Sequence, residues 1–156
     1  MKVGSVERVR MALAAADHED TIFAFPEGTR TAVDAANAAG CDVSQIVKSL
    51  VFRTGDQPVL VLTSGSNRVD ERKVEELLGS KLEAAKGRWV REVTGFAIGG
   101  VSPIAHKSPL QIFIDEDLMK LSIVWAAAGS PTHVFSTKPD KLQEMTGGQI
   151  ADVKVD

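Results

Sequence analysis

Two neighbouring apolar segments, residues 47–53 and 58–63, constrain the fold more than any other feature of this chain. Both have the length and the valine- and leucine-rich composition of buried strands, and the short segment between them contains Gly55. A glycine between two such segments is typical of a tight turn. The pattern therefore predicts a β-hairpin. Its first strand carries one lysine, Lys48, within an otherwise apolar run.

Lys48 and a later glycine-rich segment together predict a pocket. A buried ammonium needs an anion, a carbonyl or a lowered pKa, unless the side chain extends to solvent at a sheet edge. Residues 94–103 contain the pair Gly99–Gly100, which lets the main chain approach a ligand closely, although such pairs also occur in simple turns. We expect a pocket with one cationic donor and bare main-chain N–H groups.

Helices and strands alternate along the rest of the chain. The spacing of apolar residues and the capping residues predict helices near 6–16, 31–39, 70–78, 86–94 and 137–145, with a short helix beginning at 42 or 44. Thr137 and Asp140 have the spacing of a capping box. Strands are expected at 21–25, 110–114, 122–128, 132–135 and 150–153. Because hairpins outnumber strand–helix–strand units, this order favours an α+β fold with a mixed sheet. Without a linker or repeat, residues 1–156 are expected to form one domain.

Composition excludes several classes of function. The single cysteine, Cys41, permits no disulfide within the chain and fits a reducing cytoplasm, where we expect the protein to act. The apolar runs are too short to span a membrane. The net charge of −3 argues against a general nucleic-acid binder, although basic residues between 57 and 110 are candidates for a local basic face.

The usual catalytic groups are missing from the sequence. His18, His106 and His133 are scattered without metal-ligand spacing, and the acidic run 115–117 is interpreted as a solvated turn. We expect no metal and no cofactor. An enzyme of this kind would work by positioning, hydrogen bonding and water, which suits substrates that are already activated, such as esters.

Four segments resemble the YbaK/ProX family, free-standing aminoacyl-tRNA deacylases related to the editing domain of bacterial prolyl-tRNA synthetases. They are residues 45–50, 94–103, 112–115 and 126–131, and the resemblance extends over residues 20–155. Lys48 matches the family's near-invariant lysine, and Gly99 and Pro103 match the ends of its Gly-x-x-x-Pro loop. The resemblance implies a mixed, partly barrel-like sheet flanked by helices.

The resemblance also implies a function and a set of site residues. The function is trans-editing: hydrolysis of mischarged tRNA, with tRNA-Pro as the expected carrier and a small amino acid such as alanine, cysteine or serine. Residues 127–129 are Ala-Ala-Gly where relatives that remove cysteine carry Ser-Gly-Gly, which weakens a cysteine-specific reading. The expected catalytic residues are Lys48, Gly99 and Gly100, whose N–H groups would stabilise an oxyanion. The expected substrate-binding residues are Thr31, Ser102, Pro103, Gly129 and Ser130.

The expected partners are the acceptor end of an aminoacylated tRNA and an aminoacyl-tRNA synthetase, with no membrane partner. Two alternatives stay open at this point. The same pocket could bind an aminoacyl or nucleotide group without hydrolysing it, or the protein could regulate a synthetase by contact alone.

Overall fold

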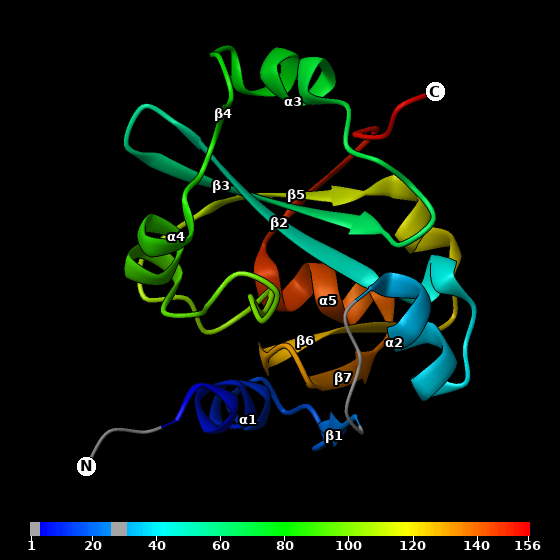
Figure 1. Cartoon of the computed structure of the whole chain (residues 1–156). Coiled ribbons are helices and arrows are strands. Elements are labelled where there is room, and N and C mark those ends of the chain that lie inside the picture. The colour runs from blue at the N-terminus through cyan, green and yellow to red at the C-terminus, as the bar shows by residue number, and fades with distance from the viewer. Residues whose placement is uncertain (1–3, 26–30) are drawn as a thin grey trace.

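The computed structural model describes residues 4–25 and 31–156, which form two β-sheets with helices around and between them (Figure 1). The described helices are α1 (Ser5–Ala15), α2 (Ala32–Ala39), α3 (Glu71–Leu78), α4 (Gly87–Thr94) and α5 (Pro139–Thr146), with the short 3-10 helices η1 (Val43–Gln45) and η2 (Glu116–Lys120). Most begin and end where the sequence predicts. Thr31 caps α2 through a capping box with Asp34, and Gly40 ends that helix in the left-handed conformation.

The larger sheet has the strand order β4-β2-β3-β5-β8. Its strands are β2 (Val47–Thr54), β3 (Gln57–Ser64), β4 (Glu83–Ala84), β5 (Gln111–Asp115) and β8 (Gln149–Ala151). The β2–β3 hairpin is antiparallel, whereas β3–β5 and β5–β8 are parallel. The predicted hairpin and the mixed sheet of an α+β fold are therefore confirmed.

The smaller sheet has the order β1-β7-β6 and is formed by β1 (Phe23–Ala24), β6 (Val124–Ser130) and β7 (His133–Thr137). A single bridge between Ile46 and Trp125 connects the two sheets just before β2 begins. The sheets do not close into a barrel. This bridge brings the β6–β7 hairpin close to the residues around Lys48.

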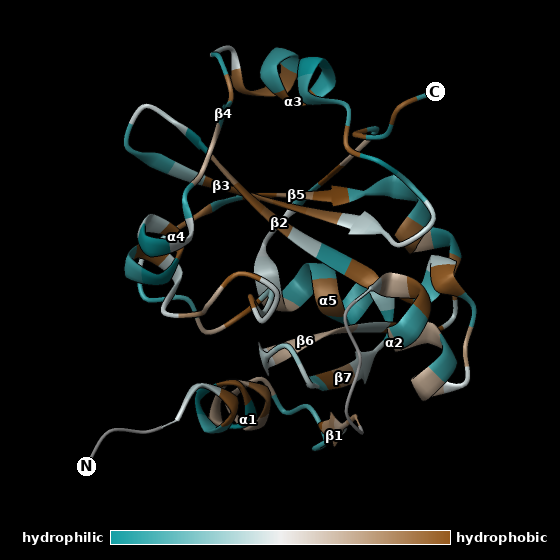
Figure 2. Ribbon diagram, viewed as in Figure 1, coloured by the Kyte–Doolittle hydropathy of each residue, from teal (hydrophilic) through white to brown (hydrophobic). Residues whose placement is uncertain are grey.

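The main core lies between the sheets. Leu60 and Leu62 of β3 point into a cluster with Phe135 of β7 and Leu142 of α5, and Figure 1 shows α5 between the two sheets. Val59 and Val61 point to the opposite face, where Val74 of α3 and Val153 cover them. Side chains alternate between the faces of a strand, so the middle of β3, Val59 to Leu62, is continuously apolar because both faces of the strand are covered there (Figure 2).

Two local predictions were wrong, and one short element was missed. The first strand is only Phe23–Ala24 within the described residues, shorter than the predicted 21–25. Helix α5 has Lys138 as its N-cap, and the Thr137 hydroxyl contacts His18 instead of forming a capping box. The two-residue strand β4 was not predicted, because so short a segment has no measurable pattern. No helix in the described part of the chain is long and apolar enough to cross a membrane.

Candidate active site

A pocket of about 600 Å³ lies where the start of β2, helix α2, the glycine-rich loop and the β6–β7 turn meet. Four of the predicted site residues line it: Thr31, Lys48, Gly99 and Ser130. Most of the remaining lining is apolar and includes Ile98, Trp125 and Ala127. A concave, largely apolar site with a few polar groups is typical of small-molecule recognition.

Lys48 is half-buried on β2 and has a main-chain partner. Its ammonium donates a hydrogen bond of 2.5 Å to the carbonyl of Asn67. Burial lowers the pKa of Lys48, and the nearby Arg68 guanidinium lowers it further, while the Asp115 carboxylate opposes both. The sequence argument expected a carbonyl, an anion or a lowered pKa, and Lys48 has both a carbonyl partner and a lowered pKa.

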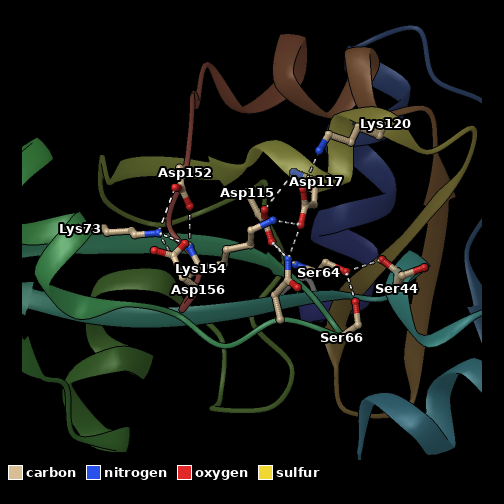
Figure 3. A network of polar contacts seen from close by, with 11 residues as sticks. Ser44, Ser64, Ser66, Lys73, Asp115, Asp117, Lys120, Asp152, Lys154 and Asp156 are labelled. Carbon is tan, nitrogen blue, oxygen red and sulfur yellow. Dashed lines mark hydrogen bonds and ion pairs between the residues drawn. The ribbon is translucent and has the colours of Figure 1, made fainter.

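Asp115 ends β5 and is fully buried, so the prediction that residues 115–117 form a solvated turn was wrong for this residue. Its carboxylate accepts hydrogen bonds from the main-chain N–H of Ser64 (3.1 Å), the side-chain amide of Asn67 (2.8 Å) and the N–H of Asp117 (2.9 Å). Figure 3 shows Asp115 and Asp117 near one another in a polar network that also includes Lys120 and Lys154. Three donors compensate the buried negative charge.

The two adjacent glycines occupy different environments. Gly99 is exposed at the pocket, has φ of 90°, and a Cβ there would meet only Pro131, at 3.9 Å. Gly100 is buried, and its N–H donates to the Ala97 carbonyl at 2.9 Å. Within residues 4–25 and 31–156, the Gly99 N–H has no hydrogen-bond partner. Gly99 is therefore the better placed of the two to donate to a ligand.

A hydroxyl–imidazole pair lines the same pocket. Ser130 Oγ lies 2.7 Å from Nδ1 of His133, and the Ser130 hydroxyl also accepts the N–H of Thr132 at 3.2 Å. Both side chains are half-buried, and both line the pocket. The sequence argument included Ser130 but treated His133 as one of three scattered histidines. The available signal was the Ser-x-x-His spacing across a hairpin turn, which places both side chains near one end of the β6–β7 pair.

The other predicted site residues do not line the pocket. Ser102 is buried, and its hydroxyl accepts the N–H of Ile104 at 3.3 Å. Pro103 is buried beside it. Gly129 has φ of 93°, and a Cβ there would lie 2.6 Å from the Ser5 carbonyl, so this glycine permits α1 to pack against β6. These residues support the segments that line the pocket without lining it themselves.

The described residues contain no group of three or more His, Cys, Asp or Glu side chains that could hold a metal ion. Cys41 is half-buried, and burial raises the pKa of its thiol, which disfavours the reactive thiolate. Among the described residues, the pocket offers a ligand the Lys48 ammonium, the Gly99 N–H and the Ser130–His133 pair.

Comparison with known proteins relates this chain to one family. The model of the family described as "Aminoacyl-tRNA editing domain" matches residues 26–145. The uncharacterised protein YwhH of Bacillus subtilis (strain 168) is 29% identical over 147 residues, which are 94% of each chain. A protein of Enterococcus faecalis named "Putative Cys-tRNA(Pro)/Cys-tRNA(Cys) deacylase EbsC" is 27% identical over 84% of this chain and 81% of its own length. A proline–tRNA ligase of Thermoanaerobacter sp. is 28% identical over 83% of this chain, which corresponds to 23% of the ligase.

Solved structures give the same relationship. A crystal structure described as "a putative trans-editing enzyme for prolyl tRNA synthetase" superposes with a TM-score of 0.94 at 44% identity, covering 100% of both chains. The structure of hypothetical protein APE2540 superposes with a TM-score of 0.87 at 28% identity, covering 95% of this chain and 99% of its own.

Proposed function

This chain belongs to the aminoacyl-tRNA editing domain family, and we propose that it hydrolyses the ester bond of mischarged tRNA as a single, free-standing domain. The observation that carries the proposal is the convergence of Lys48, Gly99 and the Ser130–His133 pair on one pocket. The near-complete coverage of the E. faecalis relative and of the solved trans-editing structure supports action outside a ligase.

We propose a small amino acid, alanine, cysteine or serine, carried on tRNA-Pro. The mostly apolar wall of the pocket, to which Ala127 and Trp125 contribute, suits a short side chain. The names of the E. faecalis protein and of the solved structure both refer to proline tRNA or its synthetase. Alanine or serine fits the Ala-Ala-Gly sequence at 127–129 better than cysteine does.

In the proposed mechanism, water attacks the carbonyl carbon of the aminoacyl ester. The carbonyl oxygen becomes an oxyanion, to which the Gly99 N–H donates. Lys48 holds the terminal phosphate, the ribose or the carbonyl as a fixed positive charge. When the tetrahedral intermediate collapses, the C–O bond to the ribose breaks and the ribose hydroxyl takes a proton, giving free amino acid and tRNA. Among the described residues that line the pocket, His133, oriented by Ser130, is placed to accept a proton from the attacking water.

The test is single-turnover deacylation of tRNA-Pro charged with alanine, serine or cysteine, with Pro-tRNA-Pro as the matched control. The wild type should release at least one of the small amino acids and spare proline. Lys48→Ala should lower the rate by about 10²–10³-fold with an unchanged melting temperature. Binding without turnover would instead indicate a recognition module, and binding of a synthetase without any RNA binding would indicate a regulatory partner.

A further inference from the structure

The main chain after β3 turns back over β2 and places Asn67 against Lys48. Lys48 pairs with Thr63 in the hairpin register, and the N–H of Asn67 donates to the Ser64 carbonyl at 2.9 Å. This turn brings the Asn67 carbonyl to the Lys48 ammonium. A lysine has a long, flexible side chain with three donors, so one carbonyl contact restricts where its charge lies. The position of that charge therefore depends on how firmly residue 67 is held.

The side chain of Asn67 is held by two carboxylates. Its amide nitrogen donates to Asp115 Oδ2 at 2.8 Å and to Asp117 Oδ2 at 2.9 Å. An asparagine amide has two N–H donors, so these contacts use both of them. Hydrogen bonds to ionised acceptors are shorter and stronger than neutral ones. Asn67 thus joins the two acids through its side chain and Lys48 through its carbonyl.

Asp115 is the rigid part of this arrangement because it is fully buried on β5, a strand inside the larger sheet. In the described part of the chain, its carboxylate makes no direct ion pair and is held by hydrogen bonds alone. Replacing this carboxylate by an apolar residue would leave the N–H groups of Ser64, Asn67 and Asp117 without their acceptor. Its charge acts on Lys48, because Asp115 raises the pKa of that ammonium against burial and Arg68.

The outer side of the turn is fixed by the end of the chain. Asp117 accepts hydrogen bonds from Lys154 at 2.8 Å and Lys120 at 3.0 Å (Figure 3). The N–H of Asp70 donates to the Val153 carbonyl at 2.7 Å, and the N–H of Val155 donates to the Arg68 carbonyl at 2.8 Å. Residues 68–70, which follow Asn67, are therefore held by hydrogen bonds to residues 153–155 at both of their ends.

We propose that Asn67 and Asp115 are positioning residues that fix the Lys48 ammonium in the wall of the pocket. Their effect on turnover rests on the proposed deacylase function, whereas their effect on Lys48 itself does not. Asp115 acts through the Asn67 amide and through its charge, and Asn67 acts through its carbonyl.

The experiment compares wild type with Asn67→Ala, Asp115→Asn and the control Ser66→Ala. Ser66 lies in the same turn and is exposed, and its hydroxyl has one hydrogen-bond partner among the described residues, the Ser64 hydroxyl. The first readout is the pH dependence of Lys48 acetylation by acetic anhydride, followed by mass spectrometry, which requires no tRNA. The second is single-turnover deacylation, with melting temperature measured on the same samples.

Asp115→Asn should move the Lys48 acetylation profile to lower pH, because loss of the anion lowers the pKa of the ammonium. Arg68 is the other charged group that acts on Lys48, and it is unchanged. Asn67→Ala should also alter the acetylation profile of Lys48. It should lower the rate of deacylation by roughly 10²-fold, which is the effect expected when a group in the site is displaced by about an ångström. Ser66→Ala should match the wild type in both readouts.

An acetylation profile identical to that of the wild type in a folded Asn67→Ala or Asp115→Asn protein would overturn the proposal. Because Asp115 is buried, its variant can fail to fold, and the half-buried Asn67 then provides the decisive result. A shifted profile in a protein whose wild type deacylates nothing would contradict the proposed function and leave the positioning role standing.

Discussion

The hydroxyl of Ser130 lies 2.7 Å from Nδ1 of His133, and the two residues flank the turn that connects β6 and β7. The β6–β7 register shifts between Ala127 and Ser130, which marks a β-bulge or irregularity just before this turn, and Ser130 pairs with His133. An irregularity of this kind redirects side chains at the end of a hairpin. Here it leaves Ser130 and His133 together on the wall of the pocket.

His133→Ala should lower single-turnover deacylation by about 10²-fold or more, because a positioned proton acceptor typically contributes that much. His18→Ala is the matched control, since His18 contacts Thr137 and lines a different cavity. Both variants should remain folded. Equal losses of rate in the two variants, or none in His133→Ala, would remove His133 from the mechanism.

The substitution Gly100→Ala should distort the pocket more than Gly99→Ala distorts the glycine-rich loop. A Cβ at Gly100 would lie 2.8 Å from Cα of Ser130, so the loop and the β6–β7 turn would have to separate. Gly99→Ala meets no close atom but has φ of 90°, which costs about 1 kcal/mol or more in stability. Melting temperature and the rate of deacylation, measured on the same samples, would distinguish a loss of stability from a loss of catalysis in the two variants. We expect Gly99→Ala to lose turnover beyond its loss of folded protein, and a rate that tracks the folded fraction would contradict its oxyanion role.

Arg8→Ala should destabilise the protein by about 1–3 kcal/mol. The Arg8 guanidinium donates to the carbonyls of Thr94, Gly95 and Ala105 at 3.3–3.4 Å and lies 4.5 Å from the centre of the Phe96 ring. It thereby attaches α1 to the start of the glycine-rich loop. Arg10→Ala, on the same helix, removes exposed ion pairs with Glu7 and Asp20, which solvent screens, and should cost much less stability than Arg8→Ala. Urea unfolding of both variants measures the difference, and similar costs would show that Arg8 does not support the loop.

The free energy of unfolding should fall as the pH drops from about 7 to 5. Burial lowers the pKa of His106, and the nearby Arg8 lowers it further, while its hydrogen bond to the Ser102 carbonyl opposes them. As the pH falls, His106 therefore binds a proton in the unfolded chain before it does so in the folded chain. Its contribution to the free energy of unfolding is fully present above the pKa of His106 in the unfolded chain and declines below it. His106→Gln should flatten this slope in urea unfolding measured at each pH. An unchanged slope would assign the pH dependence to other groups.

Salt dependence of tRNA binding should identify Arg68 as a phosphate contact. Arg68 is exposed and lies close enough to Lys48 to lower the pKa of that lysine. Arg68→Ala should reduce the log–log slope of affinity against salt by about one. Lys73 is the control, because its ammonium is held by Asp152 and Asp156 at 3.0 and 2.8 Å. A slope that Lys73→Ala changes and Arg68→Ala does not would place the RNA on the α3 side of the molecule.

Local elements could be predicted because their signals are local. Helix α3 begins after Asp70, whose carboxylate accepts the N–H groups of Arg72 and Lys73, and it ends at Gly79 in the left-handed conformation. The β2–β3 hairpin follows from two apolar segments and the turn between them. Where a local pattern failed, a distant contact had prevailed: the Thr137 hydroxyl, expected to cap α5, contacts His18 on a segment 119 residues away.

The candidate site likewise combines features that a local pattern predicts with features that depend on distant contacts. Residue type and spacing are sufficient to predict that Lys48 lies on a mostly apolar strand and that a glycine pair follows later in the chain. The burial of Asp115, its hydrogen bond to Ser64, 51 residues earlier in the chain, and the connection through Asn67 to Lys48 arise from the way distant segments pack together. Three adjacent acidic residues in a sequence suggest a solvent-exposed turn. The free-energy cost of burying one of their carboxylates depends on hydrogen-bond donors that come from other elements. Those donors meet the carboxylate because β5 pairs in parallel with β3 and the chain turns back after β3, and neither arrangement is specified by the residues next to Asp115.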